Sequence, residues 1–155
     1  MSGRWTFRPA RAGDGKAAFD VTVRAIRSFG NDHYSSAQID GWMGERTPDF
    51  YEALIANGRM TIAERDGAVV GFVDAEPGEL TRLFVLPQEA GSGLGGRLLH
   101  IGLETARVGH MGPIRVEATL NAESFYRRHG FRRIGPGEFS HGLGGPRIEI
   151  ALMEL

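Results

Sequence analysis

Hydrophobic positions follow a helical period in the first third of the chain and an alternating period after it. A short strand is predicted over residues 6–10, and Asp14 can cap a helix that runs to about residue 28. The apolar residues of this helix recur at i, i+4 and i+7, at Phe19, Val23 and Ile26. The sequence therefore predicts an amphipathic helix with one face toward a core.

Two shorter helical segments follow a polar break. Ser35 or Ser36 caps the first of them, whose apolar residues include Trp42. Residues 49–57 form the second, and Gly58 ends it, because glycine suits the left-handed conformation that often follows a helix.

From residue 59 the pattern alternates, as in strands with one buried face. Strands are predicted over residues 59–65, 68–74 and 79–85. Asp66-Gly67 joins the first two as a hairpin turn, and Pro77-Gly78 joins the second to the third. The result is an antiparallel meander, which Pro87 brings to an end because proline cannot donate to a sheet.

A glycine-rich loop and a helix follow the meander. The glycines stand at positions 91, 93, 95 and 96, and the helical period resumes at Leu94, Leu98, Ile101 and Thr105. A strand, a glycine loop and a helix in this order present free backbone N–H groups, at the positive end of a helix dipole, to an anion.

The last third predicts a strand over residues 114–119, a helix over 122–129 that Asn121 caps, and strands over 131–134 and 147–153. A glycine-rich loop over 135–146 separates the last two strands. Because a helix connects the fourth and fifth strands, that pair should be parallel. These elements make an α+β fold with a mixed sheet, in one domain over residues 4–155.

Composition narrows the function classes. The formal net charge of −1 gives no support for a nucleic-acid partner. The chain has no cysteine, which excludes disulfides, thiolate catalysis and cysteine metal sites. No His, Asp or Glu set has the spacing of a metal site, so no metal is expected. Without a leader or a membrane-spanning stretch, a cytoplasmic protein with no membrane partner is expected.

The glycine loop has three interpretations. Gly91-Ser-Gly93-Leu-Gly-Gly96 matches the dinucleotide pattern G-x-G-x-x-G, with Glu117 about twenty residues later, which would imply NAD. However, Pro87 to Ala90 intervene after the strand, and an antiparallel meander precedes it. A Walker A loop fails, because Arg97 and a leucine follow Gly96 where lysine and Ser or Thr are required.

The third interpretation is a resemblance to the GCN5-related N-acetyltransferase (GNAT) superfamily over nearly the whole chain. The family's loop pattern, Gln/Arg-x-x-Gly-x-Gly/Ala, corresponds to Ala90-Gly91-Ser92-Gly93-Leu94-Gly95, with Ala90 at the usual Gln or Arg position. A second family pattern, Asn-x-x-x-x-Tyr followed by Gly-Phe, corresponds to Asn121, Tyr126 and Gly130-Phe131.

The resemblance implies a mixed, mostly antiparallel central sheet, splayed between strands 4 and 5, with flanking helices. It also implies acetyl-CoA as the acetyl donor, with its pyrophosphate on the glycine loop and its pantetheine arm along the freed edge of strand 4. Arg97 either adds a contact to the phosphates or is a solvated helix residue. The cofactor-binding residues would be Leu83, Phe84, Val85, Ala90, Gly91, Ser92, Gly93, Leu94, Gly95, Gly96, Arg97, Asn121 and Tyr126.

By the same resemblance, Tyr126 is the general acid that protonates the departing CoA sulfur. Phe125 makes the better core residue of the pair, which leaves Tyr126 for the site. Two carboxylates compete as the general base. Glu79 opens strand 4 on the side of Thr81, Leu83 and Val85, whereas Glu117 lies in an apolar strand beside the splay, an environment suited to a base working near neutrality.

The implied function is transfer of an acetyl group from acetyl-CoA to a primary amine by direct nucleophilic attack. His33, Tyr34 and Trp42 lie in the helical segment that lines the acceptor side in this family. The acceptor is a small-molecule or peptide amine, and a second copy of the chain is a candidate partner. The alternative is a non-catalytic GNAT module that binds acyl-CoA as a sensor or scaffold.

Overall fold

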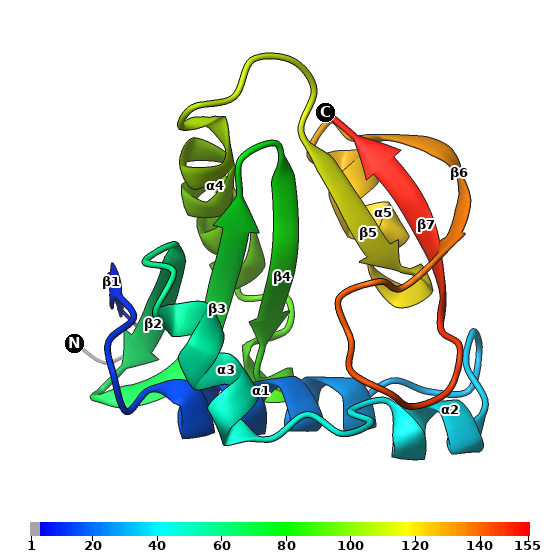
Figure 1. The fold of residues 1–155 in the computed structure, drawn as a ribbon, viewed down its shortest axis with the longest axis horizontal. Helices are drawn as coiled ribbons and strands as arrows, with labels where there is room; N and C mark the ends of the chain where they lie inside the picture. The colour runs from blue at the N-terminus through cyan, green and yellow to red at the C-terminus, as the bar shows by residue number, and fades with distance from the viewer. Residues whose placement is uncertain (1–3) are drawn as a thin grey trace.

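The computed structural model describes residues 4–155, and its strands form one sheet in the order β1-β2-β3-β4-β5-β7-β6 (Figure 1). The first four strands are antiparallel neighbours, as the predicted meander requires. The bounds of the strands are β1 (Trp5–Pro9), β2 (Met60–Arg65), β3 (Ala68–Glu76), β4 (Glu79–Val85), β5 (Arg115–Thr119), β6 (Arg132–Glu138) and β7 (Glu149–Glu154).

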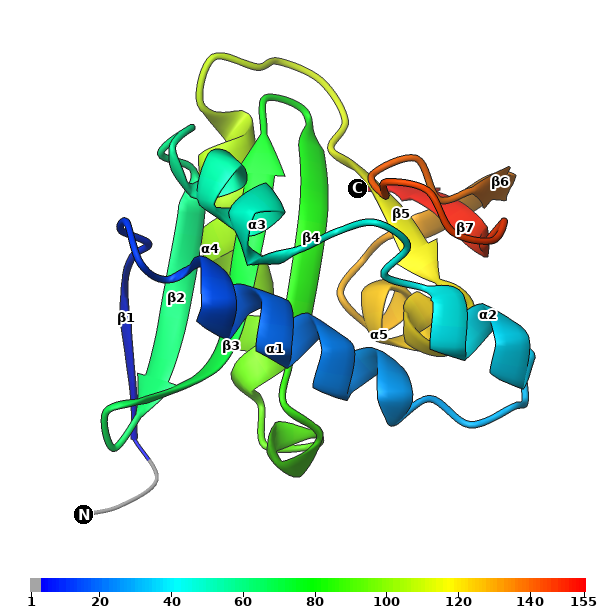
Figure 2. The same ribbon diagram turned by 60° about the horizontal axis from the view of Figure 1, so that its bottom comes forward.

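Helices cover both faces of this sheet. Figure 2 shows α1, α2 and α3 crossing in front of the sheet, with α4 behind it. Apolar residues at helical spacing, including Leu94 and Leu98, bury one side of α4 against the sheet. The helices are α1 (Gly15–Arg27), α2 (Ser36–Gly41), α3 (Pro48–Ile55), α4 (Leu94–Arg107) and α5 (Glu123–Arg128), with short 3₁₀ turns η1 (Pro87–Glu89) and η2 (Leu120–Ala122).

Strands β4 and β5 are parallel and separate soon after they begin. Their register holds only for Glu79 with Arg115 and Leu80 with Val116. Below these pairs the two strands diverge (Figure 1). The predicted splay is therefore confirmed. Since every other strand pair in the described residues is antiparallel, the successive parallel units of a dinucleotide-binding fold are absent there, and the NAD interpretation is wrong.

A β-bulge in β4 changes which side chains share a face. Arg82 pairs with Asp74 and Leu80 pairs with Ala75, so Thr81 is an extra residue in the ladder. Leu80 packs toward α4, whereas the Arg82 guanidinium lies 5.5 Å from the ring of Phe50, on the α3 side. The single row predicted from Glu79 to Val85 is therefore broken at Thr81.

Two predicted helix caps differ from the structure. Asn121 lies inside η2, and Ala122 is the N-cap of α5, so the side chain of Asn121 is not used as a cap. Asp14 is the N-cap residue of α1 but makes no cap hydrogen bond, because its carboxylate is paired with Arg8. By contrast, Ser35 forms a complete capping box with Gln38 at α2.

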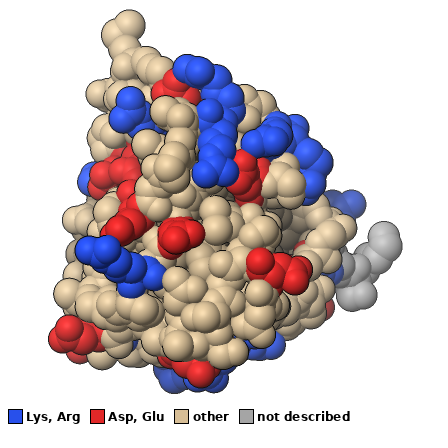
Figure 3. Space-filling model, turned by 90° about the vertical axis from the view of Figure 1, so that its right-hand side faces the viewer, with Lys and Arg blue, Asp and Glu red and all other residues tan. Residues whose placement is uncertain are grey.

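Strand β6 is longer than its pattern predicts and reaches Glu138, because the glycines after Ile134 still pair with β7. The connecting loop is therefore residues 139–148. Ion pairs cross this edge, from Arg132 to Glu154 and from Arg133 to Glu123. Figure 3 shows basic and acidic side chains interspersed on one face of the molecule. Within residues 4–155 the helices are too short or too polar to cross a membrane.

Candidate active site

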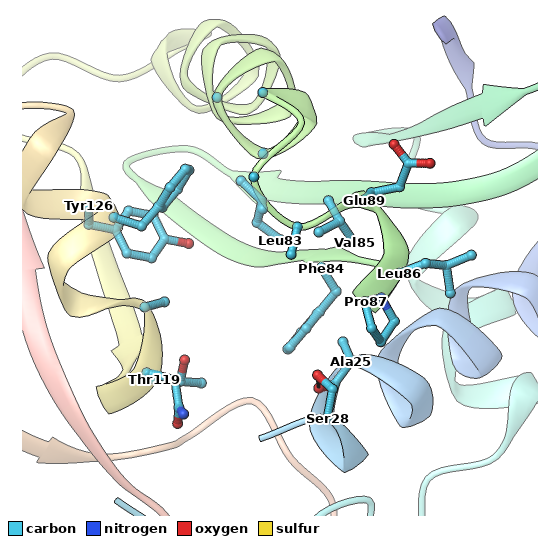
Figure 4. Close-up of a pocket in the computed structure, with 18 of the residues that line it drawn as sticks. Ala25, Ser28, Leu83, Phe84, Val85, Leu86, Pro87, Glu89, Thr119 and Tyr126 are labelled. Atoms are coloured by element: carbon cyan, nitrogen blue, oxygen red, sulfur yellow. Dashed lines mark hydrogen bonds between the residues drawn. The ribbon is translucent and has the colours of Figure 1, made fainter. Parts of the chain in front are cut away.

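A cavity of about 570 Å³ opens where β4 leaves β5. Its lining comes from the C-terminal half of β4, the glycine loop, the first turn of α4, the η2 turn, α5 and the end of α1. Of the cofactor residues predicted from the sequence, Leu83, Phe84, Val85, Ala90, Gly91, Gly93, Gly95, Gly96, Asn121 and Tyr126 all line it. The splay and the glycine loop thus belong to one site (Figure 4).

The splay leaves part of the β4 backbone without a strand partner. Leu86 donates its N–H to Val70 of the neighbouring strand. Because N–H directions alternate along a strand, Phe84 also faces β3, and the N–H groups of Leu83 and Val85 face the gap. Two free donors therefore point toward the cavity from the edge of β4.

The glycine loop keeps its backbone accessible. Gly91 and Gly93 have φ angles of 76° and 95°, in the left-handed region, and a Cβ at either position would meet nothing within 4 Å. Ser92 is used within the loop, since its hydroxyl donates to the carbonyl of Glu89 and accepts from the N–H of Leu94. The N–H groups of Gly95 and Gly96, in the first turn of α4, then lie open toward an anion.

Glu89 anchors this loop, and the sequence analysis did not identify it. Its carboxylate is 5% exposed and accepts hydrogen bonds from Trp5 and, twice, from Arg65. The Arg65 guanidinium lowers the pKa of the Glu89 carboxyl below its usual value. Arg65 and Trp5 are 24 and 84 residues away from Glu89 in the chain, so no local sequence pattern predicts these contacts.

Helix α5 packs closely on the start of α4. A Cβ on Gly95 would lie 3.3 Å from the ring of Phe125, and one on Gly96 would lie 3.2 Å from Nε2 of His129. These two glycines are therefore needed for close packing as well as for backbone access. His129, just after α5, lines the cavity, with Nδ1 2.9 Å from the carbonyl of Phe125.

Two arginines lie near the glycine loop, and the structure favours the solvated position for Arg97, one of its two predicted alternatives. Arg97 is exposed, and its guanidinium lies 5.0 Å from the ring of Phe7 on β1, outside the cavity lining. Arg128 of α5 does line the cavity. Ala90 contributes no charged group, so among the described residues Arg128 is the arginine in the cavity lining.

Tyr126 is the more buried of the two α5 aromatics, contrary to the prediction that Phe125 faces the core. Its ring is 5% exposed and contacts the rings of Phe125 and Phe131, with centroids 5.1 and 5.4 Å away. Its hydroxyl nevertheless points across the cavity toward Leu83 (Figure 4). Burial raises the pKa of the Tyr126 hydroxyl above its usual value, so it stays protonated at neutral pH.

Glu117 shares a small interior cavity of about 40 Å³ with Tyr126. Its carboxylate accepts hydrogen bonds from the N–H of Ser140 at 2.8 Å and from the Ser140 hydroxyl at 2.5 Å. Its surroundings are therefore more polar than an apolar strand predicts. Of the two candidate bases, Glu117 is the one whose cavity also contains the Tyr126 side chain.

Glu79, unlike Glu117, does not line the 40 Å³ cavity. It lines, with Glu117, a separate hollow of about 480 Å³, and its Oε2 is 2.5 Å from Nε2 of His141. One oxygen of each glutamate and a ring nitrogen of His141 lie within 4.8 Å of one another. Sequence spacing gave no metal-like set, but the fold assembles these three possible ligands from β4, β5 and the 139–148 loop.

Two of the predicted acceptor residues belong to the core. Tyr34 is 2% exposed, and its hydroxyl donates to the carbonyl of Glu149 and accepts from the N–H of Leu120. Trp42 is 3% exposed and packs edge-on to Tyr34 at 4.8 Å, although it also reaches the interior cavity of Tyr126. The exposed His33 borders a different hollow, outside the lining of the main cavity.

The chain is similar to known acetyltransferases. A family model described as an acetyltransferase (GNAT) domain matches residues 31–150. An uncharacterized N-acetyltransferase from Escherichia coli strain K12, YafP, is 24% identical over 127 residues, which cover 82% of this chain and 81% of that protein.

Solved structures share the fold. A GCN5-related N-acetyltransferase from Rhodopseudomonas palustris, also described as an aminotransferase of class II, gives a TM-score of 0.88 at 22% identity, covering 99% of this chain and 96% of that one. The PaiA N-acetyltransferase from Thermoplasma acidophilum, in complex with coenzyme A, gives 0.74 at 18% identity and covers 98% of both chains. By its fold and by the family model that spans most of its length, this chain belongs to the GNAT acetyltransferase family.

Proposed function

We propose that this protein is an N-acetyltransferase that moves an acetyl group from acetyl-CoA to a primary amine by direct attack. The observation that carries the proposal is that one cavity holds the free edge of β4, the open start of α4 and the Tyr126 hydroxyl. Coenzyme A bound to the PaiA relative of the same fold, and membership of the acetyltransferase family, support it.

Different parts of the cavity suit different parts of acetyl-CoA. The glycine loop and the first turn of α4 suit the pyrophosphate, because their N–H groups and the helix dipole favour an anion. The free N–H groups of Leu83 and Val85 suit the amide-bearing pantetheine arm and the thioester carbonyl, as an added strand would pair with a sheet edge.

The acetyl group is transferred at the thioester end of the pantetheine arm. The neutral amine attacks the thioester carbonyl carbon, so a C–N bond forms and the C–S bond breaks. Glu117 first accepts a proton from the acceptor ammonium, which frees the amine to attack. Tyr126, still protonated, gives its proton to the departing sulfur, and the extra proton of the attacking nitrogen passes to the Tyr126 oxygen, so that the products are a neutral amide and the CoA thiol. Since the chain has no cysteine, an acetyl-cysteine intermediate is excluded and direct attack is the simplest route.

Binding and turnover test this function separately. Calorimetry should show binding of acetyl-CoA and none of NAD at the same concentration. A panel of polyamines, amino acids, lysine peptides and free peptide N-termini should then include one acceptor that releases CoA, detected as free thiol. Binding of NAD without acetyl-CoA binding would contradict the proposal. Acetyl-CoA binding with no turnover on any amine would favour the acyl-CoA sensor instead.

A further inference from the structure

Arg82 is a buried cation on β4 that lines the interior cavity of Tyr126. Its side chain is 6% exposed, and its Nη1 is paired with the carboxylate of Asp74 at 3.2 Å. Its Nη2 donates to the carbonyl of His141 at 3.0 Å, but its Nε has no hydrogen-bond partner among the described residues. Because a buried N–H without a partner costs free energy, this donor points to a ligand that would complete the site.

The two donors Nε and Nη2 lie along one edge of the planar guanidinium. Such an edge matches the two oxygens of a carboxylate, which accept from both donors at once. The single carbonyl oxygen of His141 accepts from Nη2 and leaves Nε unused. Since Asp74 binds Nη1 instead, it does not compete for this edge. A carboxylate in place of the His141 carbonyl would therefore satisfy both donors.

The carbonyl that now occupies this edge belongs to a peptide group that can turn. It joins His141 to Gly142, and glycine, which has no Cβ, adopts a wider range of backbone angles than other residues. In this structure Nε is enclosed, so a ligand reaches it when this peptide group rotates and withdraws its oxygen. The carbonyl is thus a replaceable partner, whereas the pair with Asp74 is a fixed one.

The charges around this edge also favour an anion. Arg46 is a second buried arginine, 5% exposed, and it donates to two backbone carbonyls and to the hydroxyl of Tyr51, which are all uncharged. Burial and the charge of Arg82 lower the pKa of Arg46. Asp74 therefore neutralises at most one of these two guanidinium groups, and a buried charge is costly unless it is paired.

We propose that the acceptor is an amino acid, whose carboxylate binds Nε and Nη2 of Arg82 while its amine lies beside Glu117 and Tyr126. All three residues line the same interior cavity. The proposal rests on the proposed function and narrows its acceptor from any primary amine to one that carries a nearby carboxylate. Arg82 then binds the substrate and determines specificity, and it takes no part in transferring the acetyl group or a proton.

The interior cavity disfavours the other classes of amine. It is small, about 40 Å³, and aromatic side chains of Trp42 and Phe139 form part of its wall. A lysine peptide offers no carboxylate near its side-chain amine. A polyamine would bring further positive charge toward two buried arginines, which repel it. A small free amino acid combines a compact shape with one negative group for Arg82 and one amine for Glu117.

Matched amines test this proposal on the unchanged protein. A panel of L-amino acids is assayed, each beside its carboxamide, which keeps the amine and the side chain but lacks the negative charge. We expect kcat/KM for the preferred amino acid to exceed that for its carboxamide about tenfold or more, as a charge-assisted hydrogen bond predicts. Carboxamides or polyamines that react as well as every amino acid would overturn the proposal. Failure of the proposed function is distinct, because then no amine is acetylated at all.

Arg82→Lys tests the residue itself. Lysine keeps a positive charge opposite Asp74 but has no two-donor edge, so the preference for the amino acid over its carboxamide should fall about tenfold. A general loss of folding would lower both rates alike and leave their ratio unchanged. Arg8→Lys, which alters an ion pair with Asp14 outside the interior cavity, is the matched control and should keep the ratio of the unchanged protein. An unchanged ratio in active Arg82→Lys would overturn the proposal.

Discussion

The two halves of the candidate active site are built in opposite ways. The half that we propose binds acetyl-CoA comes from one continuous stretch, residues 83–96, completed by η2 and α5. The half that we propose faces the amine is assembled from side chains far apart in the chain, since Glu79 and His141 are 62 residues apart and Glu117 and Ser140 are 23 apart. The first half offers backbone N–H groups, and the second offers side-chain carboxylates and an imidazole.

This difference has a chemical reason. A diphosphate and a pantetheine arm are the same in every acetylation, so fixed backbone donors recognise them with little help from side chains. An acceptor amine varies, and its proton must be moved, so that half needs titratable groups held by long-range contacts. Changes in the backbone half should therefore alter cofactor binding, and changes in the other half should alter turnover.

The largest effect on kcat is expected at Tyr126, which lies between the two halves of the site. Tyr126→Phe removes the hydroxyl that we propose protonates the sulfur, and kcat should fall about 100-fold, in the range of general acid catalysis. The Kd of acetyl-CoA should change little, because the ring remains. Tyr51→Phe is the matched control, since its buried hydroxyl contacts Arg46 outside the cavity lining. Equal losses in both variants, with matching losses of thermal stability, would reduce Tyr126 to a packing residue.

Substitutions of two glycines should affect the two halves of the site separately. A Cβ on Gly44 would collide with the carbonyl of Leu143, which accepts the N–H of Glu45 and docks the 139–148 loop. Gly44→Ala should therefore lower kcat/KM for the amine about tenfold and leave acetyl-CoA binding within twofold. Gly93→Ala has open space but a φ of 95°, and a strain of roughly 1–2 kcal/mol should weaken acetyl-CoA binding instead. Calorimetry and initial rates on both variants decide, and the reverse pattern would contradict the division into halves.

The two arginines test how the phosphates are held. Arg128 lines the cavity, whereas Arg97 stacks on Phe7. Loss of one exposed charge-assisted contact, about 1 kcal/mol, should weaken acetyl-CoA binding about fivefold in Arg128→Ala. Arg97→Ala should change it less than twofold. If Arg97→Ala has the larger effect at low ionic strength, Arg97 leaves its stacked position to bind the cofactor.

Prediction from the sequence succeeded for the backbone half of the site more than for the side-chain half. The meander, the end of β4 near Pro87, the glycine loop and the parallel β4–β5 pair are local or topological patterns, and the structure has them. The bulge at Thr81 was missed because a single extra residue leaves no mark on an alternating pattern. It places Arg82 on the α3 side and breaks the predicted row of side chains.

The other features that could not be predicted are contacts of side chains whose partners lie far away in the chain. Tyr34 was predicted as an acceptor contact, but its hydroxyl supports the backbone of Glu149 and Leu120. His141 lies in a glycine-rich loop with no motif, and only the docking of that loop brings it to Glu79. No local spacing in the sequence reveals either contact, because Tyr34 and Glu149 are 115 residues apart and His141 and Glu79 are 62 apart.

The smallest expected effect adds a side chain to the backbone half. Ala90 is exposed beside the cavity and stands where the family pattern has Gln or Arg. If backbone N–H groups and Arg128 already supply most of the grip, Ala90→Arg should tighten acetyl-CoA binding only about threefold, as one solvent-exposed ion pair contributes less than about 1 kcal/mol. The gain should shrink at high salt, because exposed charges are screened. Ala90→Gln is the matched control, which keeps a polar side chain without the charge. A gain of a hundredfold in Ala90→Arg would show that the glycine loop alone binds phosphate poorly and that the native site lacks a necessary side chain.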